Sequence, residues 1–360
     1  MTQREEQILR WIEEDPLISQ QELAKKAGIT RSSAAVHISN LMKKGVIAGK
    51  GYILRTAPYA VVVGGVNIDI GGKSHRPLVA ADSNPGRVRM SLGGVGRNIA
   101  HNMSLLGVDV RLVTALGDDA NGQRVAASCG ELGIDISRSL RVAGGTTSTY
   151  MFISDERGDM ALALSDMDIY EKLTPGYLST LSGFLNGAQF VVADANLTAE
   201  ALTWLAENVK APLFADPVST AKAEKLWPIL GRLHTLKPNR LEAQLLSGVA
   251  ITDEASLNRA ADRLLAAGLR RVFISLGAEG VLAADERGRC RLPCCRGDMV
   301  NVTGCGDAFM AALGWSWLEG LDLEATARAG LAGAAIALEG ADTINPNMNA
   351  QNLRARARIG

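Results

Sequence analysis

The sequence predicts a small helical domain followed by a large α/β domain built on a doubly wound, mostly parallel sheet. A length of 360 residues suits one large domain with a small appendage. Residues 1–56 are rich in helix formers, whereas glycine-punctuated apolar runs begin after Pro58. From residue 59 onward, short β-branched runs alternate with longer amphipathic segments, which is typical of parallel strands joined by helices. We therefore expect domains at 1–56 and 57–360.

The composition argues against several protein classes. Hydrophobic residues make up 47% of the chain and charged residues 21%, a balance typical of soluble globular proteins. The 38 basic and 38 acidic residues cancel, so net charge predicts no general attraction to nucleic acid or membranes. No apolar run reaches the roughly 18 residues of a membrane span, and the N-terminus is acidic where a signal peptide needs an apolar run. An odd number of cysteines, five, does not suggest a disulfide scaffold. We expect a cytoplasmic protein.

The first 56 residues predict three helices and a hairpin. The helices are expected at 4–14, 20–27 and 31–44, with Ser19 and Thr30 as caps and Gly28 and Gly45 as stops. The run VIAGKGYIL then alternates like a hairpin. This is the plan of a winged helix-turn-helix, and the segment carries nine basic and six acidic residues. The third helix and the hairpin would present to DNA a set of polar side chains: Arg31, Ser32, Ser33, His37 and Lys50. A protein-interaction module remains the alternative.

Two further segments, near 70–92 and 146–164, resemble antiparallel hairpins rather than βαβ units. Extra strands beside a doubly wound sheet suggest a small β lid over its carboxyl edge, where ligands normally bind. Such hairpins would leave open strand edges, which a second copy could cover. We therefore expect a homodimer.

The clearest chemical signal is the run 301–309, NVTGCGDAF, which precedes a helix rich in small residues. Gly304 and Gly306 flank Cys305 and allow a ligand to approach the backbone, while a helix start favours anions. Asp307 lies in the opening turn, where its carboxylate could take a proton from a hydroxyl group. A purely structural capping role for this segment is the alternative.

Two segments could hold a polyhydroxylated ligand. Gly93, Gly94 and Asn98 begin a helix after a hairpin-like run, which disfavours a dinucleotide loop. Asn67 and Asp69 follow the strand-like run AVVVGG and share one face by alternation, which suits contacts to adjacent hydroxyls. Asp69 could equally be a turn residue.

Two other segments could serve a nucleotide. Asn239 and Glu242 form a capping-box pattern, which explains them structurally; alternatively they organise water around a nucleotide-bound Mg²⁺, in which case Glu242 acts on the metal through water. Ser275, Gly277 and Gly280 end a strand in a glycine turn that could lie against phosphates. A Walker A loop is missing, because Asn67 stands where the pattern needs glycine. Cysteines 290, 294 and 295 lack the spacing of a zinc site.

Together, these motifs resemble the ribokinase-like (PfkB) family of carbohydrate and nucleoside kinases over about residues 59–346. The glycine pair with Asn98 is similar to the first family signature, and 301–307 to the second, with Asn-x-x-Glu between them. The resemblance implies a ribokinase-like fold and ATP as phosphoryl donor. It implies that Asp307 is the catalytic base, that Gly304, Cys305 and Gly306 form an anion hole, and that Asn239 and Glu242 support Mg²⁺. It also implies that Ser275 and Gly277 border ATP, and that Asn67, Asp69, Gly93, Gly94 and Asn98 hold ribose.

Within the family, the segments 83–89, 166–169 and 215–219 are most similar to pseudouridine kinases, some bacterial relatives of which carry an N-terminal helix-turn-helix. The resemblance therefore implies phosphorylation of the 5′-hydroxyl of a ribonucleoside, with pseudouridine favoured. Asn301 stands where many members have Asp, which makes dependence on a monovalent cation doubtful. Two alternatives remain: a transcription regulator whose kinase-like domain senses a nucleoside or sugar, and a free-sugar kinase.

Overall fold

The structure, a computed structural model, describes residues 1–47, 58–295 and 297–360. The chain divides into two compact units, Met1–Pro58 and Tyr59–Gly360. In the described part of the chain, no helix is long and apolar enough to cross a membrane.

The N-terminal unit contains the three predicted helices, α1 (Gln3–Glu14), α2 (Gln20–Ala27) and α3 (Arg31–Lys43). Thr2 and Ser19 begin the first two helices with capping boxes, and Gly28 ends α2 in the left-handed conformation. One apolar side of each helix meets in a small core that contains Ile8, Ile12, Leu23, Ile38 and Leu41. The predicted hairpin falls mostly on 48–57, outside the described residues, and so does Lys50.

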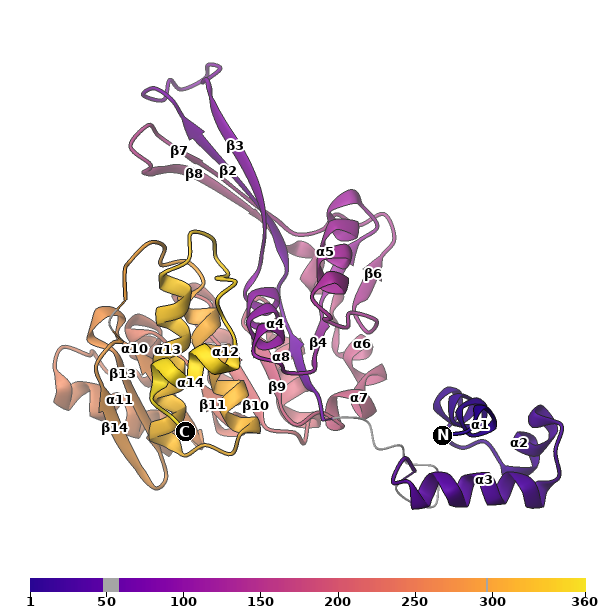
Figure 1. The fold of residues 1–360 in the computed structure, drawn as a ribbon. Coiled ribbons are helices and arrows are strands. Elements are labelled where there is room, and N and C mark those ends of the chain that lie inside the picture. The colour runs from indigo at the N-terminus through magenta and orange to yellow at the C-terminus, as the bar shows by residue number, and fades with distance from the viewer. Residues whose placement is uncertain (48–57, 296) are drawn as a thin grey trace. The chain divides into compact units, whose positions relative to one another are not determined.

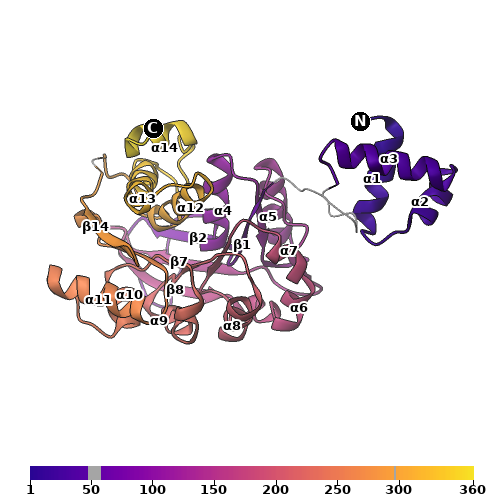
Figure 2. The same cartoon turned by 90° about the horizontal axis from the view of Figure 1, so that it is seen from below.

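The larger unit is centred on a mixed sheet, shown edge-on among its helices in Figure 2. Eight described strands form it in the order β14-β13-β12-β11-β10-β9-β1-β4. The pairs from β12 to β4 are parallel, whereas β13 and β14 add an antiparallel edge. The strands are β1 (Ala60–Val63), β4 (Val110–Val113), β9 (Val191–Asp194), β10 (Leu213–Asp216), β11 (Thr235–Leu236), β12 (Arg271–Ser275), β13 (Val281–Asp285) and β14 (Gly288–Leu292).

Helices cover both faces of this sheet because its central strands are apolar on both sides. In β1, Val61 and Val63 face one core, and Ala60 and Val62 face the other. The second core lies under α4 (Val95–Leu105), α5 (Ala120–Glu131), α12 (Cys305–Leu318), α13 (Leu323–Leu338) and α14 (Ala350–Ala357). The first lies under α6 (Pro175–Thr180), α7 (Ser182–Asn186), α8 (Ala199–Asn208), α9 (Thr220–Ala223), α10 (Arg240–Ser247) and α11 (Glu254–Ala266).

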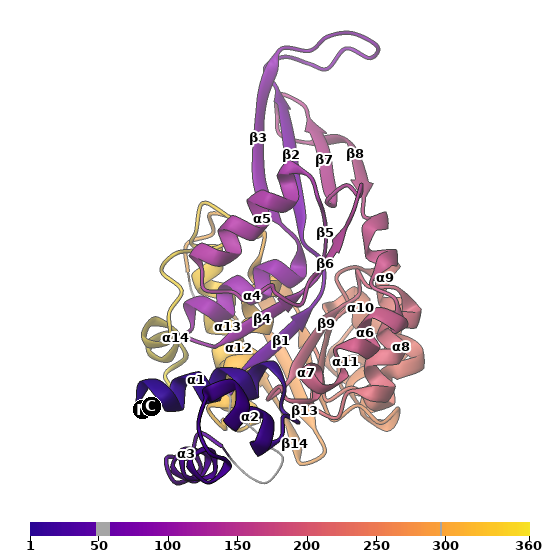
Figure 3. The same cartoon turned by 90° about the vertical axis from the view of Figure 1, so that its right-hand side faces the viewer.

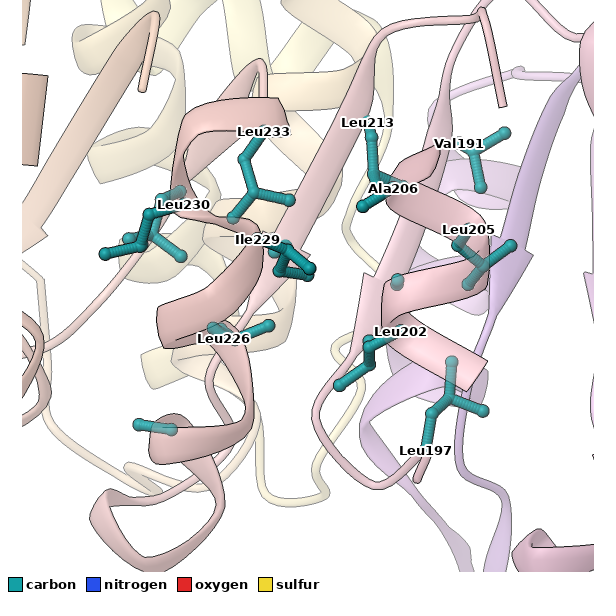
Figure 4. Packing of buried hydrophobic residues seen from close by; sticks show 14 of the residues in the cluster. Val191, Leu197, Leu202, Leu205, Ala206, Leu213, Leu226, Ile229, Leu230 and Leu233 are labelled. Carbon is teal, nitrogen blue, oxygen red and sulfur yellow. The ribbon is translucent and has the colours of Figure 1, made fainter. Parts of the chain in front are cut away.

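Leucine-rich packing between neighbouring helices completes the first core. Leu202 and Leu205 of α8 are fully buried, as is Leu226 in the adjoining 3-10 helix Glu224–Arg232 (Figure 4). Burial of each such side chain stabilises the fold by about 1.5–3 kcal/mol. The packed core on this side of the sheet therefore supports the loops at the strand ends.

A second sheet projects from the body of the larger unit (Figures 1 and 3). Its described strands run in the order β3-β2-β7-β8, and β2 pairs antiparallel with β3 and parallel with β7. The strands are β2 (Asn67–Ser74), β3 (Gly86–Gly93), β7 (Thr149–Ser154) and β8 (Met160–Asp166). We call this sheet the lid. A short parallel pair of strands, β5 (Ala115–Gly117) and β6 (Leu140–Val142), follows the body strand β4 and precedes the lid strand β7 in the sequence.

Candidate active site

The helix start at Cys305 depends on a glycine. Gly304 caps α12 with a φ of 84°, a left-handed conformation that glycine adopts readily. A Cβ at Gly304 would also collide with the backbone oxygen of Thr343. Because the cap carries no side-chain acceptor, the first amide groups of α12 remain available to an external anion.

Asp307, in the first turn of α12, is hydrogen-bonded to Asn98, a residue of the segment that is similar to the first family signature. The Asn98 amide Nδ2 in α4 donates a hydrogen bond of 2.8 Å to Asp307 Oδ2, across 209 positions of sequence. Burial, together with the nearby charge of Asp216, raises the pKa of Asp307 to about 8 despite opposing contributions from Asn98 and Lys237. A carboxyl group with a pKa near neutrality suits general-base chemistry. The structure thus brings together the two predicted motifs.

A buried ion pair that the sequence reasoning missed lies behind this helix start. Lys237 Nζ is 3.2 Å from Asp216 Oδ2, and both side chains are almost fully buried. Burial alone would lower the pKa of Lys237, but the carboxylates of Asp216 and Glu242 outweigh it and raise that pKa. A Cβ built on Gly306 would lie 3.4 Å from Lys237 Nζ, so the ammonium group adjoins the glycine loop.

A signal for this pair exists in the sequence. Asp216 ends the apolar strand LFAD, and Asp194 ends its neighbour VVAD in register with it. Asp194 is fully buried, where its oxygen accepts a 2.7 Å hydrogen bond from the Gly65 amide, and burial raises its pKa. Carboxylates that end buried parallel strands lie at the edge where ligands bind.

Asn67 and Asp69 lie at the root of the lid, in β2, rather than at the end of the first strand of the body. The Asn67 amide Nδ2 donates to Asp69 Oδ1 at 2.5 Å, and burial raises the pKa of Asp69. Gly93 lies opposite Asn67, and a Cβ there would collide with the Asp69 carboxylate. Gly94, with a φ of 98°, passes so close to Gly65 that a side chain would clash with the backbone.

The predicted nucleotide residues divide into two groups. A cavity of about 610 Å³ is lined by residues that include Lys237, Ser275, Gly277, Gly280, Cys305 and Gly306. Asn239 and Glu242 are not among its described lining residues. They form the predicted capping box, in which Glu242 Oε2 accepts from the Asn239 amide at 2.8 Å. Burial raises the pKa of Glu242. Asn239 nevertheless adjoins Ser275 through an isolated bridge between the two strand ends.

Protein ligands for a metal ion are sparse. Among the described residues, no group of three or more His, Cys, Asp or Glu side chains is placed to hold one. A metal ion at this site would therefore need oxygen ligands from phosphate and water, which is the usual habit of Mg²⁺.

The loop at Asn301 is closed by its own side chain. Its Nδ2 donates to the Ala341 carbonyl oxygen at 3.3 Å, and its Oδ1 accepts from the Thr303 amide at 2.9 Å. The Asn301 amide group thus links the two segments.

The predicted DNA-contacting residues belong to the N-terminal unit. Arg31, Ser32 and Ser33 are exposed at the start of α3. His37 is half-buried, and its Nδ1 has no hydrogen-bond partner in the described chain.

Comparison with known proteins decides the family. Residues 57–350 match the model of the pfkB family carbohydrate kinases. The chain belongs to this family. Residues 1–48 match the model of the winged helix-turn-helix DNA-binding family, so the PfkB domain here follows a winged helix-turn-helix segment. As a PfkB kinase, the chain is a phosphotransferase of an ATP-using family.

Three relatives illustrate the similarity. The uncharacterized sugar kinase YeiI of Escherichia coli is 41% identical, over 98% of each chain. The pseudouridine kinase of the same organism is 38% identical, over 83% of this chain and 96% of its own length. The ribokinase of Thermotoga maritima has the same fold, with a TM-score of 0.75 at 23% identity over 84% of this chain and all of its own. The predicted ribokinase-like fold and the PfkB membership are thereby confirmed.

Proposed function

We propose that this chain is an ATP- and Mg²⁺-dependent kinase that phosphorylates the 5′-hydroxyl of a ribonucleoside, with pseudouridine as the favoured acceptor. The observation that carries the proposal is the hydrogen bond between Asn98 and Asp307, which orients a carboxyl group of raised pKa beside a glycine-lined helix start. The identity to a pseudouridine kinase supports this acceptor.

In this proposal Asp307 takes the proton of the acceptor hydroxyl as the phosphoryl group moves in line. The amides of Gly304, Cys305 and Gly306 stabilise the developing negative charge, and Lys237 adds a buried positive charge behind them. Asn67 and Asp69, with Gly93 and Gly94 leaving the space, bind the sugar hydroxyls. Ser275, Gly277 and Gly280 border the nucleotide. ATP supplies the phosphoryl group, and Mg²⁺ would be held by its phosphates and by waters that Asn239 and Glu242 orient.

A substrate panel tests the proposal. The purified chain is given ATP and Mg²⁺ with pseudouridine, uridine, inosine, adenosine, ribose or fructose 6-phosphate, and phosphorylated product is measured. We expect the highest kcat/KM with pseudouridine. Phosphorylation of ribose or fructose 6-phosphate alone would identify a sugar kinase instead.

A second function, DNA binding, is favoured by the recognition helix. α3 contains no acidic residue, and Arg31, Ser32, Ser33, Ser39 and Lys43 are exposed on it. We expect a mobility shift with DNA from upstream of the gene, weakened by Arg31→Ala but not by Arg10→Ala on α1. If no acceptor is phosphorylated but a nucleoside changes the DNA affinity, the chain is a sensor rather than a kinase.

We also propose a homodimer formed through the lid. One face of the lid sheet exposes Val88, Met90, Ile153, Leu162 and Leu164, each at least 39% exposed. A contiguous apolar face of this kind normally marks an interface. Light scattering should give a dimeric mass that Leu162→Asp converts to a monomer, whereas a monomeric wild-type protein would refute the proposal.

A further inference from the structure

The lid sheet has a second face, opposite its apolar face, on which side chains of neighbouring strands lie side by side in rows. Strand register places Gly93 beside Asn67, then Ser91 and Tyr150 on either side of Asp69. The next row holds Arg89, Gly71 and Phe152, and the last holds Arg87, Lys73 and Ser154. Successive rows are about 6.5 Å apart, because two residues advance a strand by that length. The proposed sugar-binding residues and these outer rows therefore lie on one continuous face.

A hollow of about 670 Å³ occupies the outer rows, which we call the lid hollow; it is lined by Gly71, Lys73, Arg87, Arg89, Phe152 and Ser154, among others. The lack of a side chain at Gly71 leaves room for the Phe152 ring, since a Cβ there would lie 2.6 Å from the tip of that ring. Tyr150 continues the aromatic wall toward Asp69, with its ring centroid 5.9 Å from that of Phe152. The aromatic rings of Phe152 and Tyr150 are suited to stacking a flat ring.

Lysine and arginine side chains line the lid hollow, together with the polar side chains of Ser74, His75 and Ser154. Within the described chain, the side chains of Lys73, Arg87 and Arg89 have no hydrogen bond or ion pair, and no carboxylate is among the lining residues. Guanidinium and ammonium groups donate hydrogen bonds and cannot accept them. A flat ligand here would thus meet donors along its edge and no anionic acceptor.

We propose that the lid hollow receives the base of the acceptor nucleoside and selects a carbonyl-bearing pyrimidine, with Arg89 and Phe152 as the specificity-determining residues. This inference rests on the proposed nucleoside kinase function. A pyrimidine-2,4-dione presents two carbonyl oxygens, which accept from guanidinium donors. Cytosine carries an exocyclic amino group in place of the 4-carbonyl oxygen, and adenine carries one at its 6-position; this group is a donor and cannot accept a hydrogen bond from Arg89. Sugar bound at Asn67 and Asp69 places its base one row further along, where it meets the Phe152 ring that covers Gly71.

The experiment compares kcat/KM for uridine, cytidine, adenosine and ribose in wild type and in Arg89→Met, Arg89→Glu and Phe152→Leu variants. Arg89→Met should lower the uridine-to-ribose ratio of kcat/KM by roughly 10- to 100-fold, because a charged hydrogen bond to the base is lost. Phe152→Leu should lower it by roughly 10-fold through loss of stacking. Arg89→Glu supplies an acceptor and should invert the preference toward cytidine, a gain that misfolding cannot produce.

Arg157→Met is the matched control, because Arg157 is exposed at the tip of the lid and does not line the hollow. It should keep the wild-type ratios. Equal losses on all four acceptors in the Arg89 variants would overturn the inference while leaving the nucleoside kinase function standing. A wild-type protein that phosphorylates ribose but no nucleoside would overturn both.

Discussion

The two sides of the candidate site are built in different ways. The proposed nucleotide side uses backbone: Gly304 and Gly306 around the start of α12, and Gly277 and Gly280 after β12. The proposed acceptor side uses side chains, from Asn67 and Asp69 to Arg89 and Phe152 of the lid. Backbone groups recognise the phosphates that every donor molecule shares, whereas side chains can change without altering the fold. Substitutions should therefore alter acceptor choice on one side and the rate or the stability on the other.

Substitution of Asp307, whose carboxyl group lies between the two sides of the candidate site, should give the largest effect on activity. Asp307→Asn removes the proposed base and is expected to lower kcat by roughly 10²- to 10⁴-fold, while nucleotide binding persists. Steady-state kinetics and calorimetric titration with an ATP analogue would measure the two quantities separately. Turnover near that of wild type would remove Asp307 from this role.

Lys237→Met should destabilise the protein and lower its activity. It leaves the buried Asp216 carboxylate without its partner, which costs about 3–5 kcal/mol of unfolding free energy. The double variant Lys237→Met/Asp216→Asn should recover much of that stability, measured by denaturant unfolding, but not the activity. Recovery of both would assign the lysine a purely structural role.

Gly304→Ala tests the backbone side directly. The left-handed conformation alone costs about 1–2 kcal/mol for alanine. Gly320→Ala is the matched control, since Gly320 has a φ of 68° and open space around its Cβ position. Both variants should lose stability from strain, and Gly304→Ala should lose more because its Cβ also collides with Thr343. Only Gly304→Ala should lose kinase activity. Equal activity in the two variants would argue against an anion hole at this helix start.

The pH dependence should give the smallest and most specific effect. A general base must be ionised, and the raised pKa of Asp307 means that it is mostly protonated at pH 7 in the free enzyme. The kcat/KM should therefore rise about tenfold per pH unit below about pH 8 and level off above it. If kcat/KM instead rises around pH 4, close to the ordinary aspartate pKa of about 3.9, the pKa of the Asp307 carboxyl group is not perturbed.

Local patterns were sufficient to predict much of the fold and some of the local geometry at the candidate site. Apolar alternation indicated the parallel sheet, and the capping-box pattern at Asn239 and Glu242 is present as predicted. Lys237 follows a strand-like run, but local patterns do not reveal that it pairs with Asp216 at the end of the neighbouring strand. The Asn98–Asp307 contact joins segments that no local pattern relates. The antiparallel edge of β13 and β14 was likewise not foreseen, since sequence alternation does not reveal strand direction.

The contact between Asn98 and Asp307 also has a consequence for protein synthesis. Asn98 leaves the ribosome some two hundred residues before the carboxyl group that it orients. An unfinished polypeptide that stops before Asp307 would contain the proposed sugar-binding strands and part of the central sheet, but not the proposed proton acceptor. If Asp307 is the catalytic base, chains that stop before this residue should consume no ATP.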